Sequence, residues 1–230
     1  MRGCLRLLAV FLAAALAGSP ARATSVYEYA KGEYVLIDSG MAPNGHLSLA
    51  AHGEGEFGSE NFYVYLMAEP AHRRIAALGG ITDNLDSGPT AFRAAWAPDS
   101  RRVAVAYRIE RHVTVTLLYR IERGRAVEID GPSLFKEVTS RDVDDGTDHE
   151  NNSFTSLSWL SPRRFVLRED RLFIGAPPSL LPSLGRFGKQ ENEEVYEKRV
   201  FFKFSAAAIC ELLRGNRYRI VDLKPGAFED

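Results

Sequence analysis

Cysteine is scarce in this chain, which contains Cys4 and Cys210 among its 230 residues. Cys4 lies in an N-terminal segment that we expect to be removed on export. The one thiol that remains cannot form a disulfide within the chain, even in an oxidising compartment that permits disulfides. We therefore expect Cys210 to be small apolar filler in a packed core.

A surplus of basic charge is lacking as well. The N-terminal segment carries Arg2, Arg6 and Arg22, so the rest of the chain has 26 basic and 30 acidic side chains and a net charge of −4 with histidine neutral. Nucleic-acid phosphates bind clustered Lys and Arg side chains. The composition thus excludes a nucleic acid as the expected partner.

Apolar runs of membrane length are also missing. The apolar run at residues 7–17 is shorter than the ~20 residues of a membrane span. It follows a basic start and precedes Ala21-Arg22-Ala23, a small-x-small cleavage site. The pattern predicts a signal peptide over residues 1–23, a single exported domain over residues 24–230, and a periplasmic or secreted location. An uncleaved anchor is the alternative.

Sequence signatures of catalysis and of cofactor or metal binding do not occur. There is no Gly-x-Ser-x-Gly nucleophile elbow, and glutamates in the Gly-rich segment 52–58 would repel phosphate. The five histidines, at positions 46, 52, 72, 112 and 149, have no zinc-ligand spacing. The sequence therefore assigns no catalytic, cofactor-binding or metal-binding residue.

What the sequence does contain is a series of short alternating segments. Residues 92–129 predict one four-stranded antiparallel sheet, with strands at 92–96, 102–108, 112–120 and 125–129 and a turn at Ala97-Pro98-Asp99-Ser100. Four similar segments precede it, at 33–37, 46–51, 62–67 and 73–77. Their turn, at Ala42-Pro43-Asn44-Gly45, is of the same kind, because proline fixes φ and Asn-Gly tolerates the left-handed conformation.

A third copy of this pattern is more degenerate. We expect strands at 154–159, from 165 onward, at 195–204 and at 217–223, with a turn at Pro162. A polar interruption is expected at 169–194. A short amphipathic helix is predicted over residues 206–214, with Ser205 as its N-cap and Gly215 just past its end.

The three turns, at Pro43, Pro98 and Pro162, lie 55 and 64 residues apart. The stretch Trp96-Ala97-Pro98-Asp99-Ser100 resembles the β-propeller repeat of the TolB-like and WD40-like class, whose turn reads Trp-Ser-Pro-Asp-Gly. The resemblance implies an all-β fold of three to four antiparallel four-stranded meander sheets, propeller-like and incomplete, with one short C-terminal helix. Proteins of this class serve as binding platforms, peptidase appendages and parts of envelope complexes.

An open row of such sheets leaves apolar faces and strand edges uncovered. The long loops and the helix at 206–214 are the expected cover. The alternatives are a homodimer, in which two chains complete a ring, and a protein or envelope component that supplies the missing surface.

The most polar segment is 141–150, where Asp142, Asp144, Asp145, Asp148 and Glu150 accompany His149. Its spacing departs from that of a calcium-binding EF-hand, so we expect a solvated connecting loop.

Two functions are compatible with these patterns. The first is an exported, non-catalytic binding module of the bacterial envelope. The alternative is a secreted hydrolase of peptides or glycans whose carboxylates come from residues 142–150 and from the loop 54–60.

Cleavage after Ala23 is directly testable. Intact-mass measurement of the exported protein should give a chain that begins at Thr24. Ala23→Leu should block processing because the last leader residue must be small, whereas Arg22→Ser, at the unrestricted position beside it, should be processed normally. Recovery of the parent protein with residues 1–23 still attached would contradict the signal-peptide assignment.

Overall fold

The computed structural model describes residues 25–192, 200–214 and 217–227. The leader predicted at 1–23 and the start of the strand predicted at 195 lie outside these residues. The strands, in chain order, are β1 Val35–Met41, β2 Leu47–Glu54, β3 Glu60–Ala68, β4 Arg73–Ala77, β5 Arg93–Trp96, β6 Arg102–Glu110, β7 Val113–Glu122, β8 Arg125–Ile129, β9 Glu150–Trp159, β10 Arg164–Ile174, β11 Gly188–Asn192, β12 Val200–Leu212 and β13 Tyr218–Pro225.

Short helical segments lie in the connections between strands. They are η1 Glu56–Gly58, η2 Pro89–Ala91, α1 Leu134–Thr139, α2 Asp145–Asp148, α3 Leu180–Leu184 and η3 Gly185–Phe187. Within the described ranges, no helix has the length and apolar character needed to cross a membrane.

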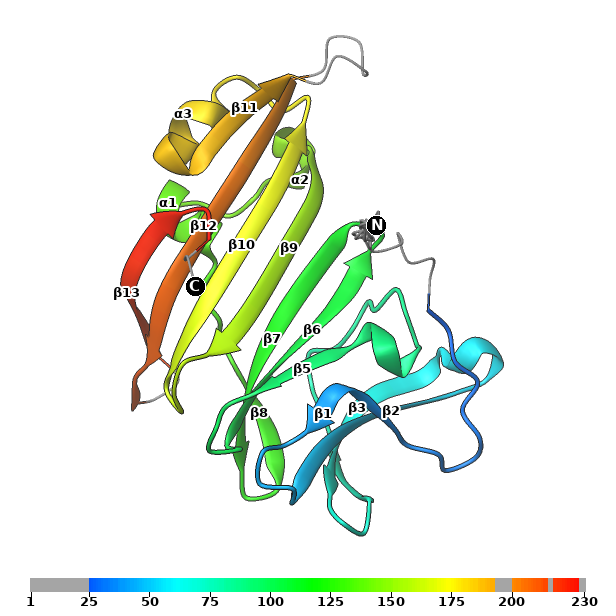
Figure 1. Ribbon diagram of the computed structural model, residues 1–230. Helices are drawn as coiled ribbons and strands as arrows, with labels where there is room; N and C mark the ends of the chain where they lie inside the picture. The colour runs from blue at the N-terminus through cyan, green and yellow to red at the C-terminus, as the bar shows by residue number, and fades with distance from the viewer. Residues whose placement is uncertain (1–24, 193–199, 215–216, 228–230) are drawn as a thin grey trace, which may run out of the picture.

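The described strands form one mixed sheet of 13 strands (Figure 1). Three antiparallel groups follow one another along the chain: β1–β4, β5–β8 and β9–β13, called here the first, second and third groups. Parallel pairing joins them, between β1 and β5 and between β7 and β9. The second group therefore lies between the other two.

The predicted set of separate propeller-like meander sheets is wrong. Main-chain pairing crosses both boundaries at which independent blades would touch only through side chains. Asp38 of β1 lies opposite Arg93 of β5, and Val113 and Thr114 of β7 lie opposite Ser153 and Phe154 of β9. The result is a single sheet that is neither closed nor curled.

The predicted strands of residues 92–129 are confirmed, and so is the turn that precedes the second of them. Ala97 N donates to Arg102 O and Ser100 N donates to Ala97 O, both at 2.9 Å. The turn at Pro43 makes the equivalent two hydrogen bonds, from Ala42 N and Gly45 N. Ser100 and Gly45 both have positive φ, 57° and 67°. The two turns are thus alike in geometry as well as in sequence.

The helix predicted over residues 206–214 is wrong, because residues 206–212 form the second half of β12. This strand pairs with β10 on one edge and β13 on the other. Ala206, Ala208, Cys210 and Leu212 alternate along it and are all buried. A small-residue run satisfies helical spacing and strand alternation equally, and the two neighbouring strands decide in favour of the strand.

The polar interruption predicted at 169–194 is likewise wrong in part. β10 continues to Ile174, and α3, η3 and β11 follow before residue 193. Glu169 and Arg171 look like loop residues in the sequence, yet they lie inside a central strand with Phe173 two positions further on. A buried ion pair allows these charges to occupy the inner face.

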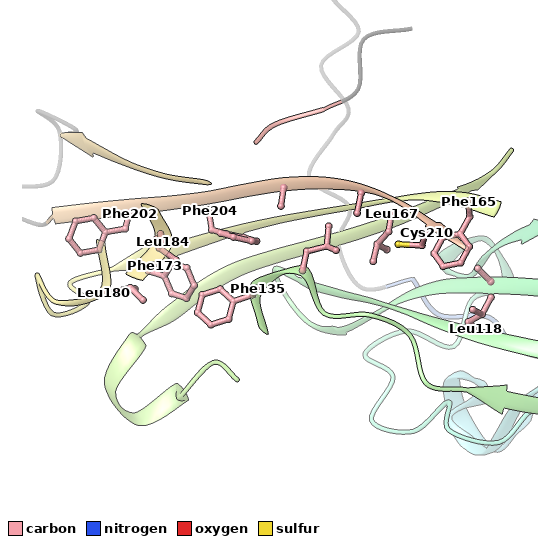
Figure 2. Packing of buried hydrophobic residues seen from close by; sticks show 14 of the residues in the cluster. Leu118, Phe135, Phe165, Leu167, Phe173, Leu180, Leu184, Phe202, Phe204 and Cys210 are labelled. Atoms are coloured by element: carbon pink, nitrogen blue, oxygen red, sulfur yellow. The ribbon is translucent and has the colours of Figure 1, made fainter. Parts of the chain in front are cut away.

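Two hydrophobic clusters hold the groups together. One combines β1–β3 with β5–β7, where the Phe92 ring lies 5.1 Å from Phe62 and 5.7 Å from Tyr107. The other combines the second and third groups with α1 and α3 (Figure 2). These helices cover the apolar face of the third group. The sequence had predicted that a helix at 206–214 would be part of this cover.

Cys210 lies in the second of these clusters and is fully buried. Burial, reinforced by the nearby charge of Glu137, raises the pKa of its thiol to about 12. The prediction that Cys210 is packed filler is confirmed.

Two tryptophan indoles connect neighbouring groups, one joining the second group to the first and the other joining the third group to the second. Trp96, at the end of β5, donates from Nε1 to Gly40 O at 3.0 Å, and Trp159, at the end of β9, donates to Ala95 O at 2.8 Å. The first strands of successive groups are thereby tied at the same end.

Trp159→Phe should lower the free energy of unfolding by about 1–3 kcal/mol, because a partly buried carbonyl loses its donor. Urea denaturation measures the change. Leu160→Ala is the matched control, since this neighbouring side chain is 56% exposed and its truncation should change stability by less than about 0.5 kcal/mol. Equal unfolding midpoints for parent and Trp159→Phe would show that the indole bond contributes nothing.

Candidate functional site

The carboxylates of segment 141–150 do not converge. Lys136 Nζ lies 2.8 Å from Asp142, Arg141 Nη1 lies 2.5 Å from Asp148, and Arg171 Nη1 lies 2.5 Å from Glu150. Three basic side chains from three separate positions in the chain thus each pair with a different carboxylate. Throughout the described residues, no group of three or more His, Cys, Asp or Glu side chains is placed to hold a metal ion.

Asp148 is the most buried of these acids. Its hydrogen bonds from Arg141 and from Asp144 N hold its pKa below the ordinary value and outweigh the opposing effect of burial. The guanidinium of Arg141 also lies 5.6 Å from the Phe135 ring centroid. Asp148 therefore fastens the connection between α1 and α2, while His149 beside it is exposed.

The second predicted source of carboxylates lies elsewhere. Glu54 accepts a hydrogen bond from Asn61 Nδ2 at 3.0 Å in the hairpin between β2 and β3, and Glu56 and Glu60 are exposed. Figure 1 shows this hairpin well separated from α2. The structure thus does not bring the loop 54–60 and the segment 142–150 together.

A different site, which the sequence did not suggest, lies on one edge of β7. β6 pairs with the opposite edge of β7 from Val113 to Arg120, which includes residues 115–117. On the edge in question, β9 pairs with Val113 and Thr114, and β8 pairs with β7 from Leu118 onward. Residues 115–117 lie between these partners, and no described strand pairs with them on that edge.

A half-open cavity of about 170 Å³ lies beside this gap. Its apolar walls come from three strands and its rim from the linker between β8 and α1. The lining residues are Val115, Thr116, Leu118, Gly131, Pro132, Ser133, Thr155, Leu157, Phe165, Leu167, Glu169 and Arg171. We call the gap and this cavity together the β7 cleft.

Main-chain groups of Thr116 face the β7 cleft. His112 O accepts from Ser153 N at 3.0 Å, which fixes the edge toward which residue 112 points. Because the main-chain N–H and C=O groups of successive strand residues point to alternate edges, those of residue 116 point to the same edge as those of residue 112. The Thr116 hydroxyl donates to Thr155 O at 3.1 Å and accepts from the Thr155 hydroxyl at 2.9 Å, which closes one end of the gap.

A buried ion cluster forms the polar end of the cleft. Glu169 is 1% exposed, and its Oε2 accepts from Leu134 N and Phe135 N at the start of α1, at 2.6 and 3.4 Å. Arg171 donates from Nε to Glu169 and from Nη1 to Glu150, both at 2.5 Å. Burial alone would lower the pKa of Arg171, but the two carboxylates outweigh it, so the pKa is raised.

This cluster has a structural role in the cleft. Both oxygens of Glu169 already accept hydrogen bonds, and the Arg171 guanidinium also packs 5.5 Å from the Phe135 ring centroid. Glu169 is therefore not free to act as a general base. The β7 cleft can accommodate a compact apolar group, since a cavity of ~150 Å³ is large enough for a benzene ring.

One sequence signal marks the β7 cleft in retrospect. Phe165, Leu167, Glu169, Arg171 and Phe173 alternate and share one face of β10, so two opposite charges interrupt an otherwise apolar face. Such an interruption indicates a buried ion pair next to the core. The gap at 115–117 has no such signal, because it depends on where β8 and β9 happen to pair.

Comparison with protein-family models, with curated proteins and with solved structures found no match for this chain. The resemblance of the Trp96 turn to a propeller repeat therefore has no family match to support it, and the single sheet contradicts the fold that it implied.

Arg171→Met should be strongly destabilising, by about 3–5 kcal/mol, because it leaves buried Glu169 without its cation. Adding Glu169→Gln should restore part of the loss, since the uncompensated charge is then gone. Arg219→Met is the matched control, because its pair with Glu211 is solvent-exposed, with Arg219 at 62%, and should change stability by less than about 1 kcal/mol. Similar losses for Arg171→Met and Arg219→Met in urea denaturation would contradict a buried structural role.

Proposed function

We propose that this protein is an exported, non-catalytic binding module of the bacterial envelope, and that its β7 cleft holds a short extended peptide segment of a protein partner. The observation that carries the proposal is the unpaired stretch at residues 115–117 beside an apolar cavity. Main-chain groups and a side-chain pocket stand next to each other there, as in recognition by strand addition.

The gap sets the length of the segment. Three strand residues span about 10 Å at ~3.3 Å per residue. A peptide of three to four residues that continues the line of β8 would pair with Thr116 and fill the space between β8 and β9. Unpaired strand edges are the usual templates for such addition.

The cavity sets the preferred side chain. Leu157, Phe165 and Leu167 supply its apolar surface, and its volume of about 170 Å³ suits one branched or aromatic side chain. Specificity would then come from this pocket and affinity from the main chain.

Export and charge support a partner outside the cytoplasm. The leader pattern at residues 1–23 predicts secretion, and the net charge of −4 after its removal favours a protein over a nucleic acid.

The hydrolase alternative lacks a supporting observation. It requires carboxylates that are free to exchange protons or attack substrate. Asp148 and Glu150 are instead engaged by Arg141 and Arg171, so we propose the binding module alone.

A blocked tripeptide with leucine at its centre tests the proposal. In NMR titration of the isotope-labelled protein, it should shift the amides of residues 115–117 and 155–157. Gly131→Leu should weaken binding by about tenfold or more, because its side chain stands at the mouth of the cavity. Gly79→Leu is the matched control, since an added Cβ meets nothing within 4 Å at either glycine, and it should bind normally.

Methylation of the peptide nitrogens separates the two parts of the proposal. It should weaken binding by about tenfold if the main chain pairs with β7. Equal binding of the methylated and unmethylated peptides would contradict strand addition while leaving an apolar site. The same conclusion would follow if free indole, used as a small apolar probe, bound and neither peptide did. No shift with any of these probes would overturn the β7 cleft as a binding site.

A further inference from the structure

Residues 33 and 34, called here the strap, cover the face of the first group that is turned away from the second. Tyr34 lies with its ring 5.2 Å from Tyr65 and 4.8 Å from His52. Beneath it, Ala50 and Met67 are fully buried. The strap is thus the cover that keeps this apolar face from solvent.

Two histidine rings hold consecutive carbonyl groups of the strap. His52 Nδ1 lies 2.5 Å from Glu33 O, and His72 Nε2 lies 2.8 Å from Tyr34 O. The other ring nitrogen of His72, Nδ1, lies 2.8 Å from Glu69 Oε1. That carboxylate also accepts from the buried Ser48 hydroxyl at 2.6 Å.

The contacts of His72 specify its protonation state. A carbonyl oxygen and a carboxylate oxygen are both acceptors, and a neutral imidazole has one N–H to offer them. The neutral ring would place a lone pair against an oxygen at one of the two contacts. Only the imidazolium donates to both.

From this geometry we propose that His72 is a pH-dependent latch: its imidazolium fastens the strap to Glu69, and loss of the proton releases the strap and uncovers the face around Tyr65 and Met67. The proposal goes beyond the function assigned to the β7 cleft, which belongs to another part of the sheet.

The charges around His72 come from three elements. Glu69, which directly follows β3, is the charged group in contact with the ring. Arg74 of β4 reaches the Tyr34 hydroxyl at 3.2 Å and lies 5.5 Å from the Tyr65 ring centroid, so it braces the strap without touching His72. His52 of β2 is engaged by the strap itself. The carboxylate of Glu69 therefore governs the latch.

The pKa values on both sides of the contact move in the expected directions. The hydrogen bond with Glu69, followed by that with Tyr34 O, raises the pKa of His72 above its ordinary value, against the effect of burial. Hydrogen bonds from Ser48 and His72 lower the pKa of Glu69.

The sign of the pH dependence follows from these directions. Because the pKa of His72 is higher in the folded state, its contribution to stability is fully present below its ordinary value of ~6.5 and is lost as pH rises through the raised pKa. Glu69 contributes above its ordinary value and loses that contribution as pH falls through its lowered pKa. The latch is closed between these two limits and opens on the alkaline side when His72 loses its proton.

Hydrogen exchange and NMR on the full processed chain test the latch. The His72 ring should titrate above pH 6.5. Protection factors for residues 33–36, corrected for intrinsic exchange, should fall about tenfold as pH passes through that pKa, while those of residues 165–167 in the core stay constant. His72→Gln should remove this pH step, because glutamine does not titrate. Glu69→Gln should move the step to lower pH, because the imidazolium loses its counter-charge.

Three results would overturn the proposal. They are a His72 pKa at or below 6.5, strap protection that does not change with pH, and an unchanged step in His72→Gln. The Glu69→Gln variant keeps the proposal testable if His72→Gln does not fold. A pH step that stays at the parental pH in Glu69→Gln would equally contradict the latch.

Discussion

Packing between apolar faces is the constraint on which the architecture depends, because few main-chain bonds join the three strand groups. Among the described residues, one residue pair connects β1 to β5 and two connect β7 to β9. Side-chain packing must therefore supply most of the free energy that holds the groups together. The stacked rings of Phe62, Phe92 and Tyr107 join the first and second groups, and Phe165, Phe204 and α1 fill the space at the third. Each boundary is therefore held by burial, and the parallel pairs set its register.

The β7 cleft is a consequence of this way of joining strands. A single edge of β7 serves β9 at one end and β8 at the other, and the two partners do not meet. A central strand that serves two partners on one edge leaves main-chain groups between them. The cluster of Glu150, Glu169 and Arg171 then fixes the start of α1 against β10, beside the linker that forms the rim of the cavity. The proposed binding site and the ion cluster that braces it thus lie in the same neighbourhood.

The strap illustrates the opposite use of polar contacts. In the cleft, Arg171 keeps its proton at any ordinary pH because a guanidinium has a very high pKa, which the two carboxylates raise further. At the strap, His72 has a single carboxylate partner and a proton that it loses as pH rises through its raised pKa. One polar set therefore makes a permanent fastening and the other a reversible one, although both lie against buried apolar surface.

Much of the strand pattern could be predicted from local sequence. The alternation at Val103, Val105 and Tyr107 predicts a strand, and proline followed by a residue that tolerates positive φ predicts the turn before it. Residues 206–212 could not be assigned in this way, because alanines fit either period and only the pairing with β10 and β13 decides. Glu169 and Arg171 were misassigned for a related reason: a charge is placed in a loop unless its partner is known, and that partner is recognised only once the strand exists.

The sequence by itself predicted an export signal, which lies outside the described residues, and it determined the β class, most strand positions and the burial of Cys210, because each depends on residues within a few positions of one another. Tertiary structure alone decided that the groups share one sheet, that residues 115–117 are left unpaired, and that His72 meets both Glu69 and the Tyr34 carbonyl. These features depend on which distant edges and faces meet, a choice made by summed packing free energy over the whole chain and carried by no local pattern.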